Sequence, residues 1–272
     1  MNIFRKVAAL ATAATLFAGF GAASAGAQTL EAVKSRGTIN VGMLVDFPPF
    51  GILDTSGQPD GYDADVAKLL AEDLGVNVNL VPVTGPNRIP YLLSGQVDVL
   101  VASLGITEER AKQIAFSDKY YDTPTGVIAL KETEIQPSAE GIEGAYLGVS
   151  VGTIHETYAR AHFSEAAADI RSYPTVDEEL QDLAAGRIDA VVGDMLALMP
   201  FLESDAGEAC CEYRGAVESD PSILGNGVGV GLRKEDTDLL ERVNSGIAAI
   251  RENGTYDALS EPYFAGFDIY GS

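Results

Sequence analysis

The architecture follows from residues 97–121, which read VDVLVASLGITEERAKQIAFSDKYY. Val97 to Ala102 form an almost continuous apolar run, which predicts a buried strand of a parallel sheet. After a short turn, Thr107 is a good N-cap for a helix whose first turn contains two glutamates. Arg110 also falls in this first turn, where a cation opposes the helix dipole. These residues therefore predict a strand, a turn and a helix, with a cation just past the carboxyl end of the strand.

Arg110 is a candidate binding group for a carboxylate. Backbone N–H groups at the start of a helix attract anions, and a guanidinium can hold a carboxylate through two parallel hydrogen bonds. The alternative is a solvated arginine that pairs with Glu108 or Glu109, which is the more common role of a lone arginine on a helix. Arg110 taken alone does not decide between the two interpretations.

A second copy of this pattern occurs later in the chain. Residues 186–192, GRIDAVV, echo residues 95–101, GQVDVLV, and the segments 37–42 and 144–149 resemble each other in the same way. The repetition predicts two lobes of related α/β design. Ligands of open α/β sheets bind outside the carboxyl ends of the strands, where one lobe carries Arg110 and the other carries Asp194. A cation and an anion on opposite walls of one cleft suit a zwitterion, of which an α-amino acid is the simplest.

Six motifs in a fixed order carry a family resemblance: RGTINVGMLVDFPPFG (36–51), GYDADVAKLLAEDLGV (61–76), NRIPYLLSGQVDVLVA (87–102), ITEERAKQIAFSDKYY (106–121), DAVVGD (189–194) and RENGTYDALSEPYFAG (251–266). The chain resembles the periplasmic amino-acid-binding proteins of ABC transporters, the polar amino-acid solute-binding family 3. The resemblance implies an α/β, two-lobed type II periplasmic binding protein fold, in which each lobe is a mostly parallel sheet flanked by helices. It also implies a free amino acid as ligand and an inner-membrane ABC permease as partner.

The resemblance assigns roles to individual residues. Arg110 falls on the position that binds the ligand's carboxylate, and Asp194 falls on the position that binds its ammonium group. Phe47 falls where an aromatic ring stacks on the ligand, although a core phenylalanine is an equally good interpretation. Thr153 matches a threonine that reaches the ligand in the family, and it also fits the N-cap of a helix that contains Glu156.

Further positions bear on the identity of the amino acid. Arg88 lies in an NRIP motif that resembles acidic-amino-acid binders, in which this arginine meets a side-chain carboxylate, so glutamate or aspartate is the leading expectation. Leu44 stands where members that bind basic ligands tend to carry an aspartate. Gly85 and Gly105 replace hydroxyl-bearing residues of the family, which would enlarge the pocket or remove a hydrogen bond, and would suit a bulkier ligand. Ser103, in the turn before Gly105, completes the predicted ligand-binding residues.

The chain begins with a segment typical of a secretory signal peptide, residues 1–27. Arg5 and Lys6 form its charged region, residues 7–20 are apolar, and residues 25–27 form an A-x-A cleavage site. The apolar run is too short to span a membrane, and no cysteine follows it to carry a lipid. We therefore expect a soluble periplasmic protein.

The mature chain is expected to divide into two lobes. Lobe 1 would contain residues 28–123 and 228–272, and lobe 2 would contain residues 124–227. Extended segments near 123–131 and 223–232 would connect the lobes and act as a hinge. The formal net charge of −22 becomes more negative when the basic signal peptide is removed. Such an acidic monomer is not expected to bind nucleic acid or an anionic membrane.

Cys210 and Cys211 are the only cysteines. Adjacent residues of a strand point to opposite faces, so two free thiols are expected, and a disulfide between them is the alternative. With only His155 and His162 in addition, no zinc-site spacing occurs and no metal is expected. His155, in the first turn of a helix, is expected to be exposed. The chain also lacks a phosphate-binding loop or other cofactor motif.

Three functions remain open. The first is a transport receptor that delivers an amino acid to the permease, and the second is a sensor that signals to a membrane receptor. The third is an enzyme, because some dehydratases and lytic transglycosylases resemble this family. An enzyme needs a positioned acid or base, but Asp194 is already explained by ammonium binding and His155 by a place in a helix's first turn. We therefore expect a binding protein with no catalytic residues.

Overall fold

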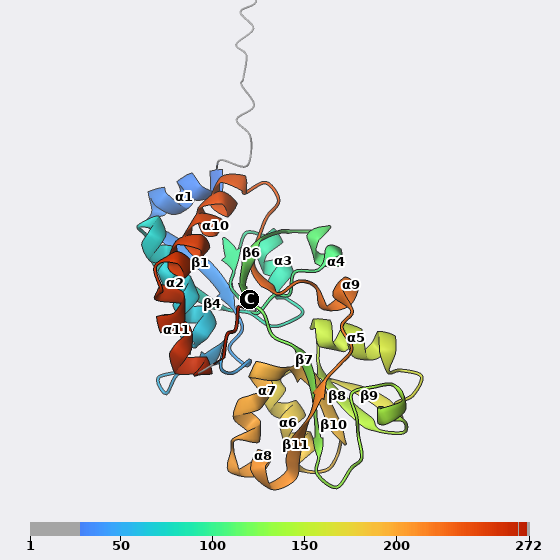
Figure 1. Ribbon diagram of the computed structural model, residues 1–272. Helices are drawn as coiled ribbons and strands as arrows, with labels where there is room; N and C mark the ends of the chain where they lie inside the picture. Colours follow the sequence, from blue (N-terminus) through green and yellow to red (C-terminus); the bar gives the residue numbers. More distant parts are fainter. Residues whose placement is uncertain (1–27, 266, 271–272) are drawn as a thin grey trace, which may run out of the picture.

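The computed structural model describes residues 28–265 and 267–270, so the predicted signal peptide lies outside the described residues. Two five-stranded sheets form two lobes, which lie one above the other in Figure 1. The chain builds most of lobe 1, crosses to lobe 2 and returns to lobe 1. This is the two-lobed α/β architecture that the sequence predicts.

The sheet of lobe 1 has the strand order β4-β1-β5-β12-β6. Its strands are β4 (Asn77–Pro82), β1 (Thr38–Met43), β5 (Val99–Leu100), β12 (Val228–Leu232) and β6 (Ala115–Tyr121). β1 pairs in parallel with β4 and β5, whereas β12 reaches the sheet from lobe 2 and runs antiparallel to β5 and β6. The sheet is therefore mixed, with a parallel half and an antiparallel half. The apolar run at 97–102 is buried as expected, but only its two central residues form a strand.

In the described part of the chain, six helices and a small hairpin accompany this sheet: α1 (Gln28–Arg36), β2 (Ile52–Leu53), β3 (Pro59–Asp60), α2 (Tyr62–Leu74), α3 (Arg88–Leu93), α4 (Glu108–Ala111), α10 (Thr237–Glu252) and α11 (Thr255–Phe264). Gly75 ends α2 in the left-handed conformation, with a φ of 70° that favours glycine. Thr107 caps α4 as predicted, because its side chain accepts a hydrogen bond from the backbone N–H of Arg110. α4 is a single turn, after which the chain enters β6.

The sheet of lobe 2 has the strand order β11-β7-β10-β8-β9. Its strands are β11 (Cys211–Ala216), β7 (Thr125–Leu130), β10 (Ala190–Asp194), β8 (Tyr146–Ser150) and β9 (Asp169–Tyr173). β8 is parallel to β9 and β10, and β7 is antiparallel to β10 and β11. The accompanying helices are the 3₁₀ helix η2 (Glu140–Ile142), α5 (Ile154–His162), α6 (Val176–Ala184), α7 (Met195–Leu202), α8 (Asp205–Cys210) and α9 (Pro221–Leu224).

The chain changes sheets in two places. One is the short segment between β6 and β7, and the other contains α9 and joins β11 to β12. Of the segments expected to cross, 123–131 lies mostly in β7, and the second half of 223–232 forms β12. These apolar residues are buried along the whole of both strands, so they form the interior of the two sheets and only the residues before each strand connect the lobes.

An aromatic cluster fixes the end of β6 from which the chain leaves lobe 1. The ring of Phe50 stacks on Tyr121 with a centroid distance of 4.4 Å, and it meets Tyr62 edge-on and Phe264 at 5.1 Å. These four side chains are buried. Aromatic packing of this kind restrains ring positions. It therefore restrains the position of Tyr121, after which the chain leaves lobe 1.

Cys210 and Cys211 form a disulfide with each other, so the expectation of two free thiols is wrong. That expectation placed both residues on one strand. The structure instead ends α8 at Cys210 and begins β11 at Cys211, so a helix–strand junction separates them.

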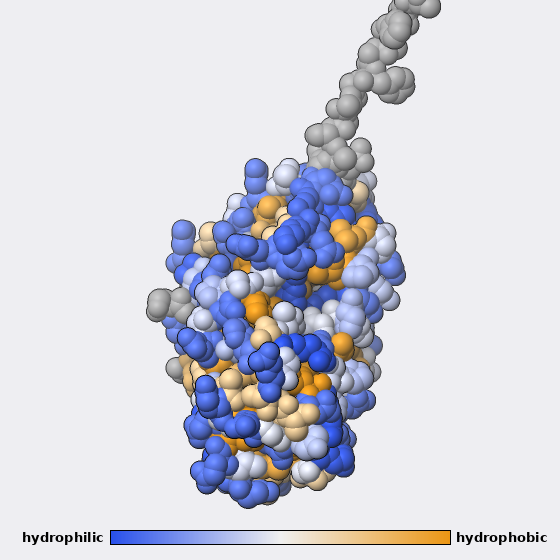
Figure 2. Space-filling view, turned by 90° about the vertical axis from the view of Figure 1, so that its right-hand side faces the viewer, coloured by the Kyte–Doolittle hydropathy of each residue, from blue (hydrophilic) through white to orange (hydrophobic). Residues whose placement is uncertain are grey.

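The face shown in Figure 2 is mostly hydrophilic, with apolar residues between the hydrophilic ones. No helix within residues 28–265 and 267–270 is both long enough and apolar enough to cross a membrane.

Candidate amino-acid-binding site

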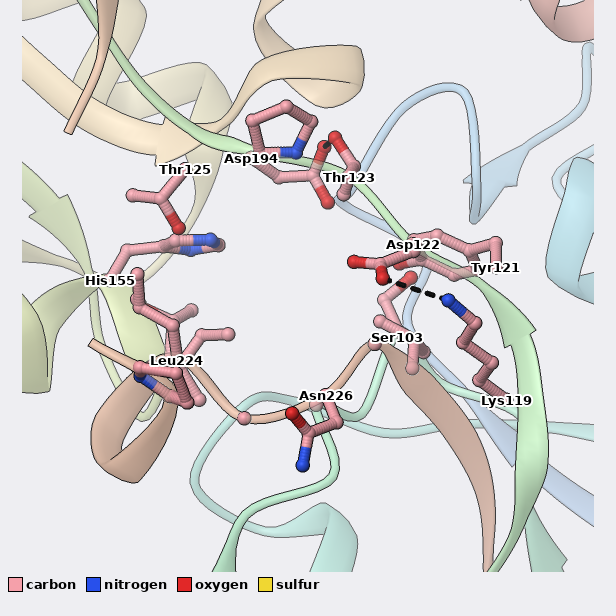
Figure 3. Close-up of a pocket in the computed structure, with 18 of the residues that line it drawn as sticks. Ser103, Lys119, Tyr121, Asp122, Thr123, Thr125, His155, Asp194, Leu224 and Asn226 are labelled. Atoms are coloured by element: carbon pink, nitrogen blue, oxygen red, sulfur yellow. Dashed lines mark hydrogen bonds and ion pairs between the residues drawn. The ribbon is translucent and has the colours of Figure 1, made fainter. Parts of the chain in front are cut away.

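A cavity of about 760 Å³ lies between the lobes. Residues of lobe 1, of lobe 2 and of both connecting segments line it, and Figure 3 shows part of this lining. All seven residues that the sequence predicts as ligand-binding contribute to it: Phe47, Arg88, Ser103, Gly105, Arg110, Thr153 and Asp194. The structure thus brings together residues that are spread over most of the chain, while their contacts with a ligand stay predictions.

Arg110 points its guanidinium at two backbone carbonyls. Nη1 donates to the oxygen of Gly105 at 3.0 Å, and Nη2 donates to the oxygen of Gly152 in lobe 2 at 3.1 Å. It does not pair with Glu108 or Glu109, and Glu109 instead pairs with a lysine one turn away. Burial, together with the smaller effect of the neighbouring Arg88 charge, lowers the pKa of Arg110 to about 9. Arg110 is therefore a cavity cation, not a surface arginine.

Asp194 ends β10 and caps α7. Its Oδ1 accepts hydrogen bonds from the backbone N–H groups of Leu196 and Ala197 at 2.9 and 3.2 Å, and from the Thr123 hydroxyl at 3.1 Å. The residue is only 4% exposed, and burial raises its pKa to about 7 although these hydrogen bonds oppose the shift. All three bonds end on Oδ1, which leaves Oδ2 as the oxygen available for another donor. Figure 3 shows Asp194 beside Thr123, across the cavity from Asn226.

Arg88 lines the cavity, and three of its five N–H donors are engaged by backbone carbonyls. Nη1 donates to the carbonyl oxygens of Ala102 at 2.6 Å and Ser103 at 3.3 Å, and Nη2 donates to that of Gly152 at 3.2 Å. Arg88 is 3% exposed, and burial lowers its pKa to about 10. Within the described ranges, neither Arg88 nor Arg110 forms an ion pair with a carboxylate.

Ser103 is held by a buried aspartate that the sequence analysis did not single out. Its hydroxyl donates to Oδ2 of Asp63 at 2.9 Å, and the Tyr120 hydroxyl donates to Oδ1 at 2.7 Å. Ser103 adopts a φ of 48°, which is rare for a residue with a side chain. Burial raises the pKa of Asp63 to about 6. Asp63 lies on the same face of α2 as the apolar Val66 and Leu70, which is a signal that sequence analysis could have used.

Gly85 and Gly105 differ in their relation to the cavity. Gly105 lines it, and a Cβ added there would lie 3.1 Å from the Ile154 side chain and 3.4 Å from Nη1 of Arg110. Gly85 does not line it, so the expectation that this glycine enlarges the pocket is wrong. A Cβ at Gly85 would instead lie 2.5 Å from the carbonyl oxygen of Val151, because the two lobes touch there.

Phe47 and Thr153 contribute to opposite sides of the cleft. Phe47 is 7% exposed and packs on Phe50 with a ring centroid distance of 5.8 Å, so it belongs to the core as well as to the cavity wall. Thr153 caps α5, accepting a hydrogen bond from the N–H of Glu156 at 3.1 Å and donating one to Ser150 at 2.7 Å. The capping role of Thr153 is therefore confirmed.

His155 is buried, not exposed as its place in the first turn of a helix suggested. It lines the cavity, and burial together with the charges of Arg110 and Arg88 lowers its pKa to about 3. The ring is therefore neutral at physiological pH.

Lys119 and Asp122 form a further polar pair in the cavity lining, which the sequence analysis missed. Their side chains make an ion pair of 3.0 Å between Nζ and Oδ2, drawn as the dashed line in Figure 3. No group of three His, Cys, Asp or Glu residues in the described part of the chain is arranged to hold a metal ion.

Comparison with known proteins identifies the family. The model of the bacterial extracellular solute-binding proteins, family 3, matches residues 39–266. The histidine-binding periplasmic protein of Escherichia coli K12 is 36% identical over 234 residues, covering 86% of this chain and 89% of that protein.

Solved structures agree. A mutant of the arginine-binding protein ArgBP from T. maritima superposes with a TM-score of 0.78 at 33% identity, covering 87% of this chain and 99% of that one. An ancestral amino-acid-binding protein, a precursor of cyclohexadienyl dehydratase, gives a TM-score of 0.76 at 32% identity, with the same two coverages. The chain therefore belongs to family 3 of the bacterial extracellular solute-binding proteins.

Proposed function

We propose that this protein captures a free α-amino acid in the periplasm and delivers it to an ABC transporter permease in the inner membrane. The observation that carries the proposal is a single cavity with Arg110 of lobe 1 and Asp194 of lobe 2 in its lining. Relatives that bind histidine or arginine support the ligand class.

Each charged group has capacity left for a ligand. A guanidinium has five N–H donors, and Arg110 uses two of them for backbone carbonyls. The other N–H groups can still donate hydrogen bonds to a ligand carboxylate. Asp194 offers Oδ2 to an ammonium group, and the Thr123 and Thr125 side chains flank it in the lining. Because the two groups come from different lobes, a zwitterion engages both only when the lobes are together, and the ligand should favour the closed arrangement.

Two ligand classes compete. Glutamate or aspartate, the expectation from Arg88, is supported by two cavity-lining arginines, Arg88 buried and Arg110 half-buried, that have no carboxylate partner among the described residues. Charges removed from water are normally paired. Histidine and basic amino acids are supported by the relatives' ligands, and by the three carbonyl oxygens that already occupy Arg88.

We further propose that the protein is a binding protein and not an enzyme. The pKa of His155 is lowered to about 3, so this ring is a poor proton acceptor near pH 7, and Asp194 is assigned here to the ligand's ammonium group. The ancestral neighbour that precedes a dehydratase makes the question testable. A bound amino acid should be recovered chemically unchanged after long incubation with the protein.

A thermal-shift screen against the common amino acids tests the proposal. A ligand at 100 times its dissociation constant should stabilise the protein by about 2.7 kcal/mol. Stabilisation by glutamate and aspartate alone would select the acidic class, and stabilisation by histidine, arginine or lysine would select the class that the relatives bind. If no amino acid stabilises the protein, amino-acid capture is wrong.

A further inference from the structure

The carbonyl oxygen of Gly152 is a meeting point of the two lobes. It lies between β8 and α5 of lobe 2 and accepts hydrogen bonds from two arginines of lobe 1, Arg88 at 3.2 Å and Arg110 at 3.1 Å. Two guanidiniums that share one neutral acceptor gain charge-assisted hydrogen bonds across the cleft, which are stronger than ordinary ones.

The two arginines differ in what else they hold. Arg110 has Gly105 as its other partner, in the turn just before it. Arg88 binds the carbonyls of Ala102 and Ser103, at the point where the chain turns after β5. The planar fork of Arg88 therefore ties this cavity-lining turn of lobe 1 directly to lobe 2, and its burial keeps the geometry fixed.

Two glycines allow this contact. A Cβ on Gly85 would lie 2.5 Å from the Val151 oxygen, and a Cβ on Gly152 would lie 3.0 Å from the backbone of Gly85 and Pro86. The backbones of the two lobes thus meet without intervening side chains. This close approach brings the Gly152 carbonyl within reach of Arg88.

We propose that Arg88 is a positioning residue that holds the two lobes together around the bound ligand and does not select the ligand's side chain. The proposal rests on the proposed function, because it assumes a ligand between the lobes. The contact of Arg88 with Gly152 exists only while the lobes touch, so it acts after the ligand has entered. Its loss should speed the dissociation of every ligand by a similar factor and leave association nearly unchanged.

Stopped-flow kinetics test this on the mature protein with L-glutamate, L-arginine and L-histidine, using those that bind the wild type. Arg88→Met keeps the length of the side chain and removes its donors. We expect the dissociation rate to rise about tenfold or more for each ligand, with association changed less than about twofold. The dissociation rate of Arg88→Lys should lie between those of the wild type and Arg88→Met, because one ammonium group cannot hydrogen-bond the same three carbonyls. Arg242→Met, on the exposed face of α10 beside Asp73, is the matched control.

Gly85→Ala provides a second test that leaves Arg88 in place. Its added Cβ collides with Val151 only when the lobes meet, so folding should persist and dissociation should accelerate as in Arg88→Met. A loss confined to acidic amino acids in Arg88→Met would overturn the proposal in favour of side-chain selection. Unchanged dissociation in both variants would also overturn it. Failure of the wild type to bind any amino acid would contradict the proposed function instead.

Discussion

The two walls of the cavity hold their charged groups in opposite ways. On the lobe 2 wall, Asp194 is anchored by the first N–H groups of the helix that it caps, so the anchors belong to the same lobe. On the lobe 1 wall, Arg110 lies in the first turn of α4, where the helix dipole disfavours a cation, and one of its two carbonyl partners belongs to lobe 2.

This difference predicts how the walls behave when the lobes separate. Asp194 keeps its backbone hydrogen bonds in an open protein, because none of them crosses the cleft. Arg110 would lose its hydrogen bond to the Gly152 oxygen and keep only the one to the Gly105 oxygen. Asp194 is therefore a preorganised group, whereas Arg110 reaches its full set of contacts only in the closed arrangement. The predictions below test this contrast.

The largest effect is expected from removing the lobe 1 cation. Arg110→Ala should weaken amino-acid binding by about 2–5 kcal/mol, because it removes one partner of a desolvated charge pair. The fold should persist, since the hydrogen bonds of the side chain end on the backbone carbonyls of Gly105, which lines the cavity, and of Gly152. Isothermal calorimetry beside the Arg242→Ala control measures the effect. A loss of less than tenfold would show that Arg110 does not bind the carboxylate.

The second test addresses the lobe 2 anion. Asp194→Asn should weaken the binding of amino acids by about 1.5–3 kcal/mol, the range for a hydrogen bond to a charged group. It should weaken the binding of analogues that lack the α-amino group much less. Asparagine is also a good N-cap, so α7 should begin at the same residue and the stability of the protein should be unchanged. Equal wild-type affinity for both kinds of compound would refute the ammonium role of Asp194.

The third prediction concerns pH and again involves Asp194. Burial raises its pKa to about 7 in the folded protein, so below this pH the carboxyl must release a proton before an ammonium group can bind. Affinity should therefore be full above pH 7 and fall by about tenfold for each unit below it. Calorimetry between pH 5 and 8 measures the slope.

The Asp194→Asn variant is the control for this slope. It should remove the Asp194 contribution and leave any part that belongs to Asp63, whose pKa of about 6 is also raised by burial. The sign for stability is opposite to that of binding. A raised folded pKa makes Asp194 destabilising once it ionises, so its contribution to unliganded stability should improve as the pH falls from 7 towards 4. A wild-type affinity that stays flat from pH 5 to 8 would contradict the assignment.

Much of the site could be predicted because its charged residues follow local patterns. The repeated glycine–aspartate strand starts locate both strand ends, and Thr107 and Thr153 lie at recognisable helix caps. Arg110 and Asp194 follow from these features within a few residues. Such local patterns can be identified in the sequence without knowledge of how the lobes are arranged.

Other features depend on contacts between distant parts of the chain. Arg88 and Gly152 are 64 residues apart and belong to different lobes, so no local sequence pattern predicts their hydrogen bond. Gly85 and His155 were misjudged for the same reason, since the close approach of the opposite lobe decides their surroundings. The disulfide was only the alternative to two free thiols, because the helix–strand junction between Cys210 and Cys211 does not follow from their adjacency.

The smallest effect is expected from that disulfide, because it lies outside the comparison of the two walls. Neither Cys210 nor Cys211 contributes to the cavity lining. A bond between adjacent residues closes almost no loop, so it removes little entropy from the unfolded chain. The Cys210→Ser/Cys211→Ser double variant should therefore bind its amino acid within about twofold of the wild type, measured by calorimetry. A larger loss would mean that the α8–β11 junction is coupled to the lobe 2 wall.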